Sequence, residues 1–322
     1  MPQLTNADHT SRPGDRVPCP CCGASHTAFE RTVAAYRLER CSACGLVFVN
    51  PRPTTQDLTD LYVAKTPESQ ADFYARTVSP AQIAEYQRIL ADLAELLPGR
   101  GRMLDLGCAA GYFMQQSTRA GFEAHGIDLA PWVEQIANER GVRNIRSGRL
   151  CDAGFADASF DIVHSSQVFE HLPHPVSELR EIHRILRPGG LLYVNVPNYQ
   201  CLSIVLGRDD FELNTPPEHV AYFTPRTIAR LLSTSGFDVL RTASYGGLKW
   251  ENLLGRPIRS EIAEAVREKR SEPATVSSSP AWAGGRPPSL AGRMARAFLY
   301  RRLQVGMTLE AFARRRIDPH TS

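Results

Sequence analysis

Between residues 102 and 245, strand-like and helix-like segments alternate along the chain. The strand-like segments are short and apolar, whereas the helix-like segments are longer and end at glycine or proline. We expect strands at 102–107, 122–128, 142–147, 159–166, 190–198 and 237–244, and helices at 79–97, 131–141, 175–187 and 224–236. Strands that alternate with helices form parallel βαβ units. The pattern therefore predicts an α/β fold with a doubly wound, Rossmann-like sheet.

A glycine-containing loop follows the first of these strands, in the segment LDLGCAAGYF at 104–113. Gly107 and Gly111 let the backbone approach a ligand, and open α/β sheets bind ligands at this edge. Asp128 ends the next strand, where a carboxylate can accept the ribose hydroxyls of an adenosine. The chain has neither G-x-G-x-x-G nor a P-loop lysine at this loop, so the cofactor is not obviously NAD or ATP.

These segments carry a family resemblance. LDLGCAAGYF, GIDLAP, FDIVHSSQVFEHLPHP and LRPGGLLYVNVPN resemble the successive motifs of class I S-adenosylmethionine methyltransferases, within 79–245. The resemblance implies a seven-stranded sheet and S-adenosylmethionine as cofactor, with a methionine pocket at the loop, the ribose on Asp128 and adenine beside Leu150. It implies these cofactor-binding residues: Asp105, Gly107, Cys108, Gly111, Asp128, Leu129, Leu150 and Gln167. Family members often have an acid in a "GD" pair near Leu150, where this chain has Gly148-Arg149.

Four cysteines near the N-terminus have the spacing C-x2-C-x18-C-x2-C. Two tight turns would place four thiolates, from Cys19, Cys22, Cys41 and Cys44, around one Zn²⁺. A segment this short gains its stability from the metal, so we expect a structural zinc ribbon with no open coordination position. Two disulfides or free thiols are the alternative, and Cys21 competes with its neighbours as a ligand. A ribbon followed by GLVFVNPRP, EHLPHP and PPEHVAYFTP resembles bacterial methyltransferases of polysaccharide or specialised-metabolite pathways.

The domain organisation follows from these motifs and from composition. We expect a disordered tail at 1–16, the zinc ribbon at 17–53, a linker and helix at 54–98, the class I methyltransferase domain at 99–245, and a partly flexible C-terminal extension at 246–322 with an Arg-rich helix at 291–316. The N-terminus is polar and lacks a secretory signal, and no apolar run reaches the roughly 18 residues of a membrane span. We therefore expect a cytoplasmic protein.

Candidate bases for methyl transfer follow two strand ends. Glu170 and His171 come after the strand at 159–166, and His219 and Tyr222 lie in the segment PPEHVAYFTP. These four residues are the predicted catalytic set, because an imidazole can take a proton near neutral pH and a positioned base accelerates transfer. Glu170 could instead orient a substrate or ligate Mg²⁺.

Several functions fit this sequence. The leading hypothesis is O-methylation of a small-molecule hydroxyl, on a sugar, glycolipid or secondary metabolite. N-methylation needs the same machinery. Sugar C-methyltransferases also begin with a Cys-rich module, but they carry a large C-terminal domain that these 322 residues do not contain. An RNA base methyltransferase would need a more basic surface than a net charge of +3 suggests. A non-catalytic interaction protein is the remaining alternative, and the intact loop with Asp128 argues against it.

Overall fold

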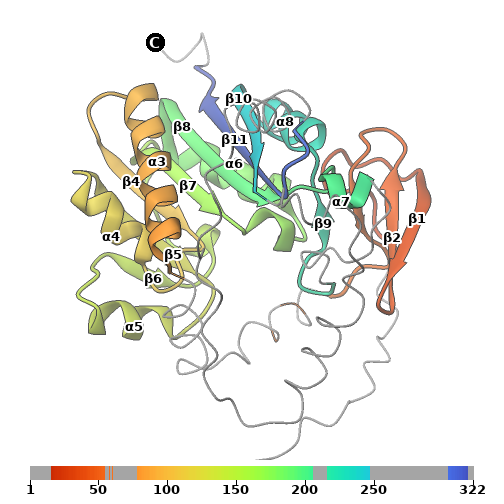
Figure 1. Ribbon diagram of the computed structural model, residues 1–322, viewed down its shortest axis with the longest axis horizontal. Helices are drawn as coiled ribbons and strands as arrows, with labels where there is room; N and C mark the ends of the chain where they lie inside the picture. The colour runs from red at the N-terminus through yellow and green to blue at the C-terminus, as the bar shows by residue number, and fades with distance from the viewer. Residues whose placement is uncertain are drawn as a thin grey trace, which may run out of the picture.

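The computed structural model describes residues 16–54, 58, 60, 78–205, 216–246 and 304–317. These residues form a seven-stranded sheet with helices on both faces and a smaller four-stranded sheet beside it (Figure 1). Residues 1–15 of the tail predicted at 1–16, most of the linker before residue 78, and residues 247–303 of the C-terminal extension lie outside the described residues. Among the described helices, none has the length and apolar character that crossing a membrane requires.

The large sheet has the mixed strand order of a doubly wound fold. In spatial order its strands are β10 (Phe237–Tyr245), β11 (Thr308–Arg315), β8 (Leu186–Pro197), β7 (Phe160–Ser166), β4 (Arg102–Leu106), β5 (Glu123–Asp128) and β6 (Ile145–Ser147). The pairs from β8 to β6 are parallel, whereas β11 is antiparallel to both of its neighbours. The predicted seven-stranded, Rossmann-like sheet is confirmed. The carboxyl ends of β4, β5 and β7 therefore meet at one edge, where ligands bind in such sheets.

Strand β11 corrects the sequence prediction at the C-terminus. An Arg-rich helix was expected across 291–316, and the strand at 237–244 was expected to be the last, but 308–315 insert as a strand between β8 and β10. All five residues from Leu309 to Ala313 are buried, including Glu310 and Phe312. A strand with both faces covered buries successive residues, so its sequence lacks a strand period of two. The flanking arginines suggested a helix surface, and residues 291–303 of that prediction lie outside the described residues.

Helices cover the two faces of the sheet. They are α3 (Pro80–Leu96), α4 (Tyr112–Arg119), α5 (Val133–Glu139), α6 (Pro175–Ile185), α7 (Leu202–Val205) and α8 (Pro225–Thr234), with 3₁₀ turns η1 (Leu150–Asp152) and η2 (Phe169–His171). Leu90 and Leu93 of α3 pack on one face with Tyr193 and Phe312, and the apolar residues of α6 and α8 pack in a separate cluster on the other. Helix α3 begins as predicted, because the Ser79 hydroxyl caps it and accepts the backbone N–H of Gln82 at 3.3 Å.

The smaller sheet joins the N-terminal segment to the α/β fold. Its order is β1 (Thr27–Val33), β2 (Tyr36–Cys41), β3 (Val47–Val49) and β9 (Ala221–Tyr222). Strand β9 comes from the segment between β8 and α8, and Phe48 of β3 pairs with Ala221. The cysteine region and the α6/α8 face of the large sheet also share one apolar cluster. The N-terminal sheet is therefore completed by a strand that lies far from it in the sequence.

Candidate metal centre and candidate active site

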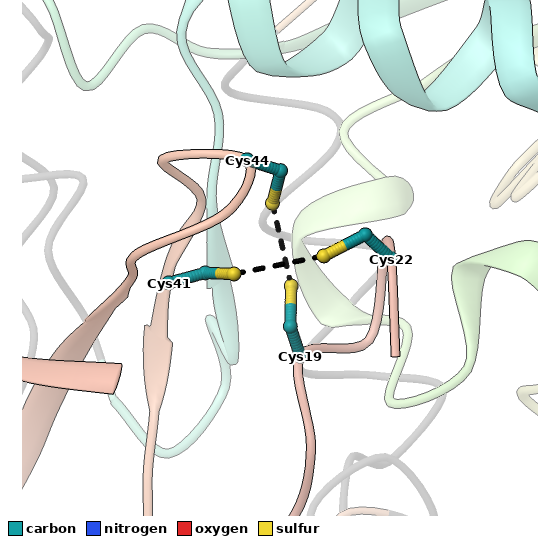
Figure 2. Close-up of side chains that lie close together, drawn as sticks. All are labelled: Cys19, Cys22, Cys41 and Cys44. Carbon is teal, nitrogen blue, oxygen red and sulfur yellow. Dashed lines mark hydrogen bonds between the residues drawn. The ribbon is translucent and has the colours of Figure 1, made fainter. Parts of the chain in front are cut away.

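Four cysteine side chains converge from two loops of the small sheet (Figure 2). The Sγ atoms of Cys19 and Cys44 are 3.5 Å apart, and those of Cys22 and Cys41 are 3.6 Å apart. All four cysteines are free, so they form no disulfide. Zn–S bonds of about 2.3 Å in a tetrahedron place sulfur atoms about 3.8 Å apart. The four thiols therefore have the number, type and spacing of ligands that one Zn²⁺ requires.

The local backbone explains why the two C-x2-C segments converge. The N–H of Gly23 donates to the carbonyl of Cys19 at 2.8 Å, and the N–H of Gly45 donates to the carbonyl of Cys41 at 2.9 Å. Both glycines have positive φ, +72° and +83°, which residues with a Cβ rarely adopt. Each turn thus points two sulfurs to the same side of the loop.

Cys21 lies outside this group of four. It is half-buried and packs against the shared apolar cluster, and burial raises the pKa of its thiol. Burial also opposes ionisation of Cys41, but the N–H groups of Cys44 and Ala43 offset it and lower the pKa of Cys41 to about 7. Burial raises the pKa of the Cys19 and Cys44 thiols as well, so the position of its sulfur, and not its pKa, sets Cys21 apart from the group of four.

The loop between β4 and α4 forms a candidate cofactor cradle. Gly107 has a φ of +77°, and a Cβ there would lie 2.3 Å from Cγ2 of Val168. Gly111 has a φ of +72° and is the N-cap of α4, without a side-chain cap. A Cβ at Gly111 would lie 3.0 Å from Cγ1 of Val142, so both glycines allow the left-handed turn and its close packing against neighbouring side chains, which fixes the path of the loop.

Asp128 connects this loop to the end of β5. Its Oδ2 accepts the backbone N–H of Ala109 at 2.9 Å, and its Oδ1 accepts that of Ala130 at 3.0 Å. Burial raises the pKa of this carboxyl, and the two N–H donors oppose that effect. Each carboxylate oxygen can accept a second hydrogen bond, so the site fits the predicted ribose contact. The carboxylate also shapes the loop, which the sequence did not indicate.

Asp105 and His164 form a buried pair beneath the cradle. Asp105 Oδ1 lies 2.7 Å from His164 Nδ1, across the β4–β7 pairing. The imidazole stacks between Phe113, with ring centroids 3.6 Å apart, and Tyr193, at 5.1 Å. The pair therefore links β4, the strand that leads into the loop, to β7 at the centre of the sheet.

The other predicted cofactor residues are distributed around this edge. Cys108 is buried against β5, where a Cβ at Gly126 would meet its sulfur at 2.8 Å. Leu129 is 47% exposed, whereas Leu150 in η1 is 2% exposed and packs in the core. Gln167 has a φ of +57° and donates from Nε2 to Asn195 Oδ1 at 2.7 Å.

The candidate catalytic residues meet where η2 faces the segment before β9. The His171 and His219 rings are 4.7 Å apart at 73°, and His171 Nε2 is 3.9 Å from Glu170 Oε1. His171 Nδ1 lies 2.8 Å from the Glu218 carbonyl. Because a carbonyl only accepts, Nδ1 carries the proton and the neutral ring has its lone pair on Nε2. His171 is thus oriented as a proton acceptor.

Glu170 has an unusual environment for a carboxylate. It is 1% exposed, and neither carboxylate oxygen has a hydrogen-bond partner among the described residues. Burial raises the pKa of this carboxyl to about 8. The side chain is therefore largely protonated at neutral pH, and it faces the two imidazoles.

Tyr222 lies on strand β9, next to this group. Its hydroxyl donates to the His219 carbonyl at 3.1 Å, and burial raises the pKa of the phenol. This geometry suits a residue that holds the His219 backbone better than one that removes a proton.

Known methyltransferases are similar to this chain in sequence. A family profile for the methyltransferase domain matches residues 75–242, more than half of the chain. The chain belongs to this methyltransferase family. A protein named "probable S-adenosylmethionine-dependent methyltransferase", from Mycolicibacterium smegmatis, is 34% identical over 155 residues. That match covers 48% of this methyltransferase and 56% of the relative, so the chain spans only about half the relative's length.

Two further similarities bear on the family and the fold. A ubiquinone biosynthesis O-methyltransferase of Xanthomonas axonopodis pv. citri is 34% identical over 181 residues, which cover 52% of this chain and 76% of that enzyme. A crystal structure of the [4+2]-cyclase SpnF aligns with a TM-score of 0.51 and 19% identity, covering 83% of this chain and 98% of the other. The second similarity shows the shared fold alone. The predicted class, a methyltransferase enzyme, is confirmed.

Among the residues that the structure describes, two groups of side chains could hold a metal. One is the group of four cysteines, and the other is Glu170, His171 and His219, whose ligand atoms lie within 4.8 Å of one another. The roles predicted for the individual site residues stay predictions.

Sequence reasoning missed one buried residue beside this site. Arg52 is 7% exposed and donates from Nη1 to the Pro173 carbonyl, in the loop between η2 and α6. The only sequence signal was its position between two prolines, at the end of the predicted ribbon.

Proposed function

We propose that the protein is an S-adenosylmethionine-dependent O-methyltransferase of small molecules, acting on a hydroxyl of a sugar, glycolipid head group or specialised metabolite. The observation that carries this proposal is the His171–His219 pair beside the cofactor edge, with the lone pair of His171 defined by the Glu218 carbonyl. The name of the Xanthomonas relative, an O-methyltransferase, supports oxygen as the acceptor atom.

The cofactor contacts proposed here are those of the cradle. The Asp128 carboxylate would bind the ribose hydroxyls, and the backbone at Gly107 and Gly111 would line the methionine part. When bound, S-adenosylmethionine supplies an electrophilic methyl group on a sulfonium. Cys108, Leu129, Leu150 and Gln167 complete the proposed contacts around the adenosine and the loop.

The acceptor half of the site would take up the proton that the acceptor hydroxyl loses. When the acceptor hydroxyl is methylated, its proton would move to the imidazole pair. Within this pair, Nε2 of His171 would accept the proton, and the His219 ring lies 4.7 Å from the His171 ring. Glu170 is protonated near neutral pH and so carries no negative charge beside the imidazoles. The imidazole that has taken the substrate proton can therefore release it to solvent more readily.

The proposal is tested with labelled methyl groups. Full-length protein is incubated with methyl-labelled S-adenosylmethionine and cell extract separated into small molecules, lipids and RNA. We expect label in the small-molecule or lipid head-group fraction, and at least about a hundredfold lower rate for His219→Ala. His26→Ala, an exposed histidine of the ribbon, is the control. Label in RNA alone, or unchanged turnover of His219→Ala, would reject this assignment.

We also propose that the four cysteines hold one structural Zn²⁺. Four protein thiolates complete a tetrahedron, so this metal would have no site for substrate. Elemental analysis should find about one zinc per chain. A chelator that removes only weakly bound Mg²⁺ or Mn²⁺ should leave turnover unchanged, and a loss would instead assign a divalent cation to Glu170, His171 and His219.

The ribbon offers little to RNA, which is the second candidate substrate. Two of its arginines are already paired with carboxylates, Arg37 with Glu39 at 2.8 Å and Arg40 with Glu30 at 2.6 Å, and Arg16, just before the ribbon, shares Glu39 at 2.8 Å. Cations that are neutralised within the ribbon contribute less to phosphate binding. This favours a small acceptor over RNA. The sugar C-methyltransferase alternative would appear in the same experiment as label on carbon.

A further inference from the structure

Gln167 has a strained backbone at the edge of the sheet where the proposed site lies. It is the first residue after β7, and its φ of +57° is left-handed. A residue with a Cβ keeps this conformation only where its surroundings hold it there, and such residues gather at functional sites. The contacts of Gln167 therefore determine the path of the chain after β7.

The turn at Gln167 lies between the cofactor cradle and the acceptor residues. Val168 comes next, and its Cγ2 would be 2.3 Å from a Cβ at Gly107, so it packs directly against the cradle. The Val168 carbonyl also accepts the backbone N–H of His171 at 2.9 Å. A change in the turn would thus move His171 relative to the cradle.

Asn195 holds Gln167 through two hydrogen bonds. Its backbone carbonyl accepts the N–H of Gln167 at 2.8 Å, and its Oδ1 accepts from Gln167 Nε2 at 2.7 Å. Asn195 lies on β8, opposite Ser166 in the parallel pairing, and is 3% exposed. The first bond belongs to the backbone, so the second is the one that depends on an asparagine side chain.

Tyr245 fixes the orientation of the Asn195 amide. Asn195 Nδ2 donates to the Tyr245 hydroxyl at 2.6 Å. Tyr245 ends β10, and β11 lies between that strand and β8. Because the hydroxyl takes the amide nitrogen, the amide oxygen remains as the acceptor for Gln167. A chain of side chains therefore connects the edge of the site to a distant strand.

We propose that Asn195, oriented by Tyr245, is a positioning residue that holds Gln167 in the left-handed turn and so sets the distance between the cofactor cradle and His171. It acts through Gln167 and touches no reacting atom. A displacement of about 1 Å can cost about a hundredfold in rate. The inference rests on the proposed cofactor and acceptor sites, so its first readout needs neither cofactor nor acceptor.

The first readout is Gln167 itself, in full-length, zinc-loaded protein labelled with ¹⁵N-glutamine. Its backbone and side-chain amide signals are assigned with Gln167→Gly. Asn195→Ala is compared with Asn198→Ala, because Asn198 is also a buried asparagine, but its side chain donates to the carbonyls of Gln304 and Gly306 at 2.8 and 2.7 Å.

We expect the Gln167 signals to shift or broaden in Asn195→Ala and to match the wild type in Asn198→Ala. Unchanged Gln167 signals in Asn195→Ala would overturn the proposal. Equal changes in both variants would also overturn it, because they would reflect a general loosening of the fold.

The second readout compares turnover with cofactor affinity. At saturating S-adenosylmethionine, Asn195→Ala should transfer labelled methyl groups about 10- to 100-fold more slowly than the wild type. Its cofactor affinity by calorimetry should fall less than about fivefold, because at most one hydrogen bond near the cofactor is lost. A smaller loss of turnover, or a loss confined to cofactor affinity, would reject the positioning role.

Gln167→Gly provides a rescue test that a merely structural residue would not pass. Glycine adopts a left-handed backbone readily, so the turn no longer needs the Asn195 side chain. In the Gln167→Gly background, Asn195→Ala should lower turnover by less than about threefold, compared with at least about tenfold in the wild-type background. Equal losses in the two backgrounds would show that Asn195 does not act through this turn.

Tyr245→Phe keeps the inference testable if Asn195→Ala does not fold. It removes only the hydroxyl that orients the Asn195 amide, so turnover should fall about 3- to 10-fold and the Gln167 signals should change. Wild-type signals and turnover in Tyr245→Phe would reject this orientation. If the wild type transferred no methyl group, the proposed function would fail, whereas the Gln167 signals would still test the hold of Asn195 on the turn.

Discussion

The cofactor half and the acceptor half of this methyltransferase are built in different ways. In the cofactor half, Gly107, Ala109, Asp128 and Ala130 lie close together in sequence, and the Asp128 carboxylate joins Ala109 to Ala130 through two hydrogen bonds. The acceptor half instead combines η2, the segment before β9 and the N-terminal ribbon, which are far apart in sequence. The cofactor half is thus local, formed by residues close in sequence. The acceptor half is assembled from segments that are distant in sequence.

This difference has consequences for stability. The cradle needs only the parallel sheet, whose centre is covered on both faces. The acceptor half needs the ribbon to be folded, and a ribbon of this size needs its metal. We therefore expect changes in the ribbon to affect the acceptor side without affecting cofactor binding, and changes in the cradle to do the reverse.

Cys41→Ser should have the largest effect. It removes the ligand whose thiolate is most accessible at neutral pH, so zinc should be lost by elemental analysis. The free energy of unfolding of the ribbon should fall by several kcal/mol, part of the roughly 10–16 kcal/mol that zinc–thiolate centres provide. Calorimetry should show S-adenosylmethionine affinity within about threefold of the wild type.

Cys21→Ser is the matched control in the same turn, because its sulfur lies outside the group of four. It should retain about one zinc per chain. Zinc retained in Cys41→Ser but lost in Cys21→Ser would show that Cys21, and not Cys41, is a zinc ligand.

Asp128→Ala should have the converse effect on the cradle. It removes the proposed ribose acceptor and leaves the N–H groups of Ala109 and Ala130 unpaired. Calorimetry should show at least about a hundredfold weaker S-adenosylmethionine binding, or about 2.7 kcal/mol. Zinc content should not change. Cofactor affinity equal to that of the wild type would remove Asp128 from the site.

The sequence predicted the local half well. The turn at Gly107, the strand end at Asp128 and the caps at Ser79 and Thr224 each depend on residues that are close in sequence. Hydrophobic periodicity and capping chemistry report such short-range structure directly. The cysteine spacing is informative for the same reason, since each pair is formed by one turn.

The assembled half could not be predicted in the same way. Strand β11 begins more than sixty residues after the end of β10, yet it inserts between β8 and β10. The local sequence LEAFA at 309–313 does not indicate this position. The burial of Arg52 and Glu170 likewise depends on contacts between the ribbon and the sheet. A charged residue in a sequence is read as exposed unless its distant partner is known.

Glu170→Gln should change how stability depends on pH. In the folded protein burial raises this pKa from 4.5 to about 8, so between these values the folded state holds a proton that the unfolded state has lost. Stability should therefore fall as pH rises, by about 2 kcal/mol from pH 6 to pH 8. Urea unfolding of Glu170→Gln should lack that decrease. An identical pH dependence in variant and wild type would show that Glu170 is ionised in the fold.

The smallest effects should come from two helix caps, one on each side of the comparison. Thr224 caps α8, whose residue Thr227 approaches Gly45 of the ribbon, and Ser79 caps α3 on the opposite face of the sheet. Thr224→Ala should lower the free energy of unfolding by about 1 kcal/mol, and the more exposed Ser79→Ala by about 0.5 kcal/mol. Neither should alter zinc or cofactor affinity, because a cap stabilises a helix without moving a ligand. A loss of zinc affinity in Thr224→Ala alone would mean that α8, as well as the β9 segment, transmits the state of the ribbon to the acceptor half.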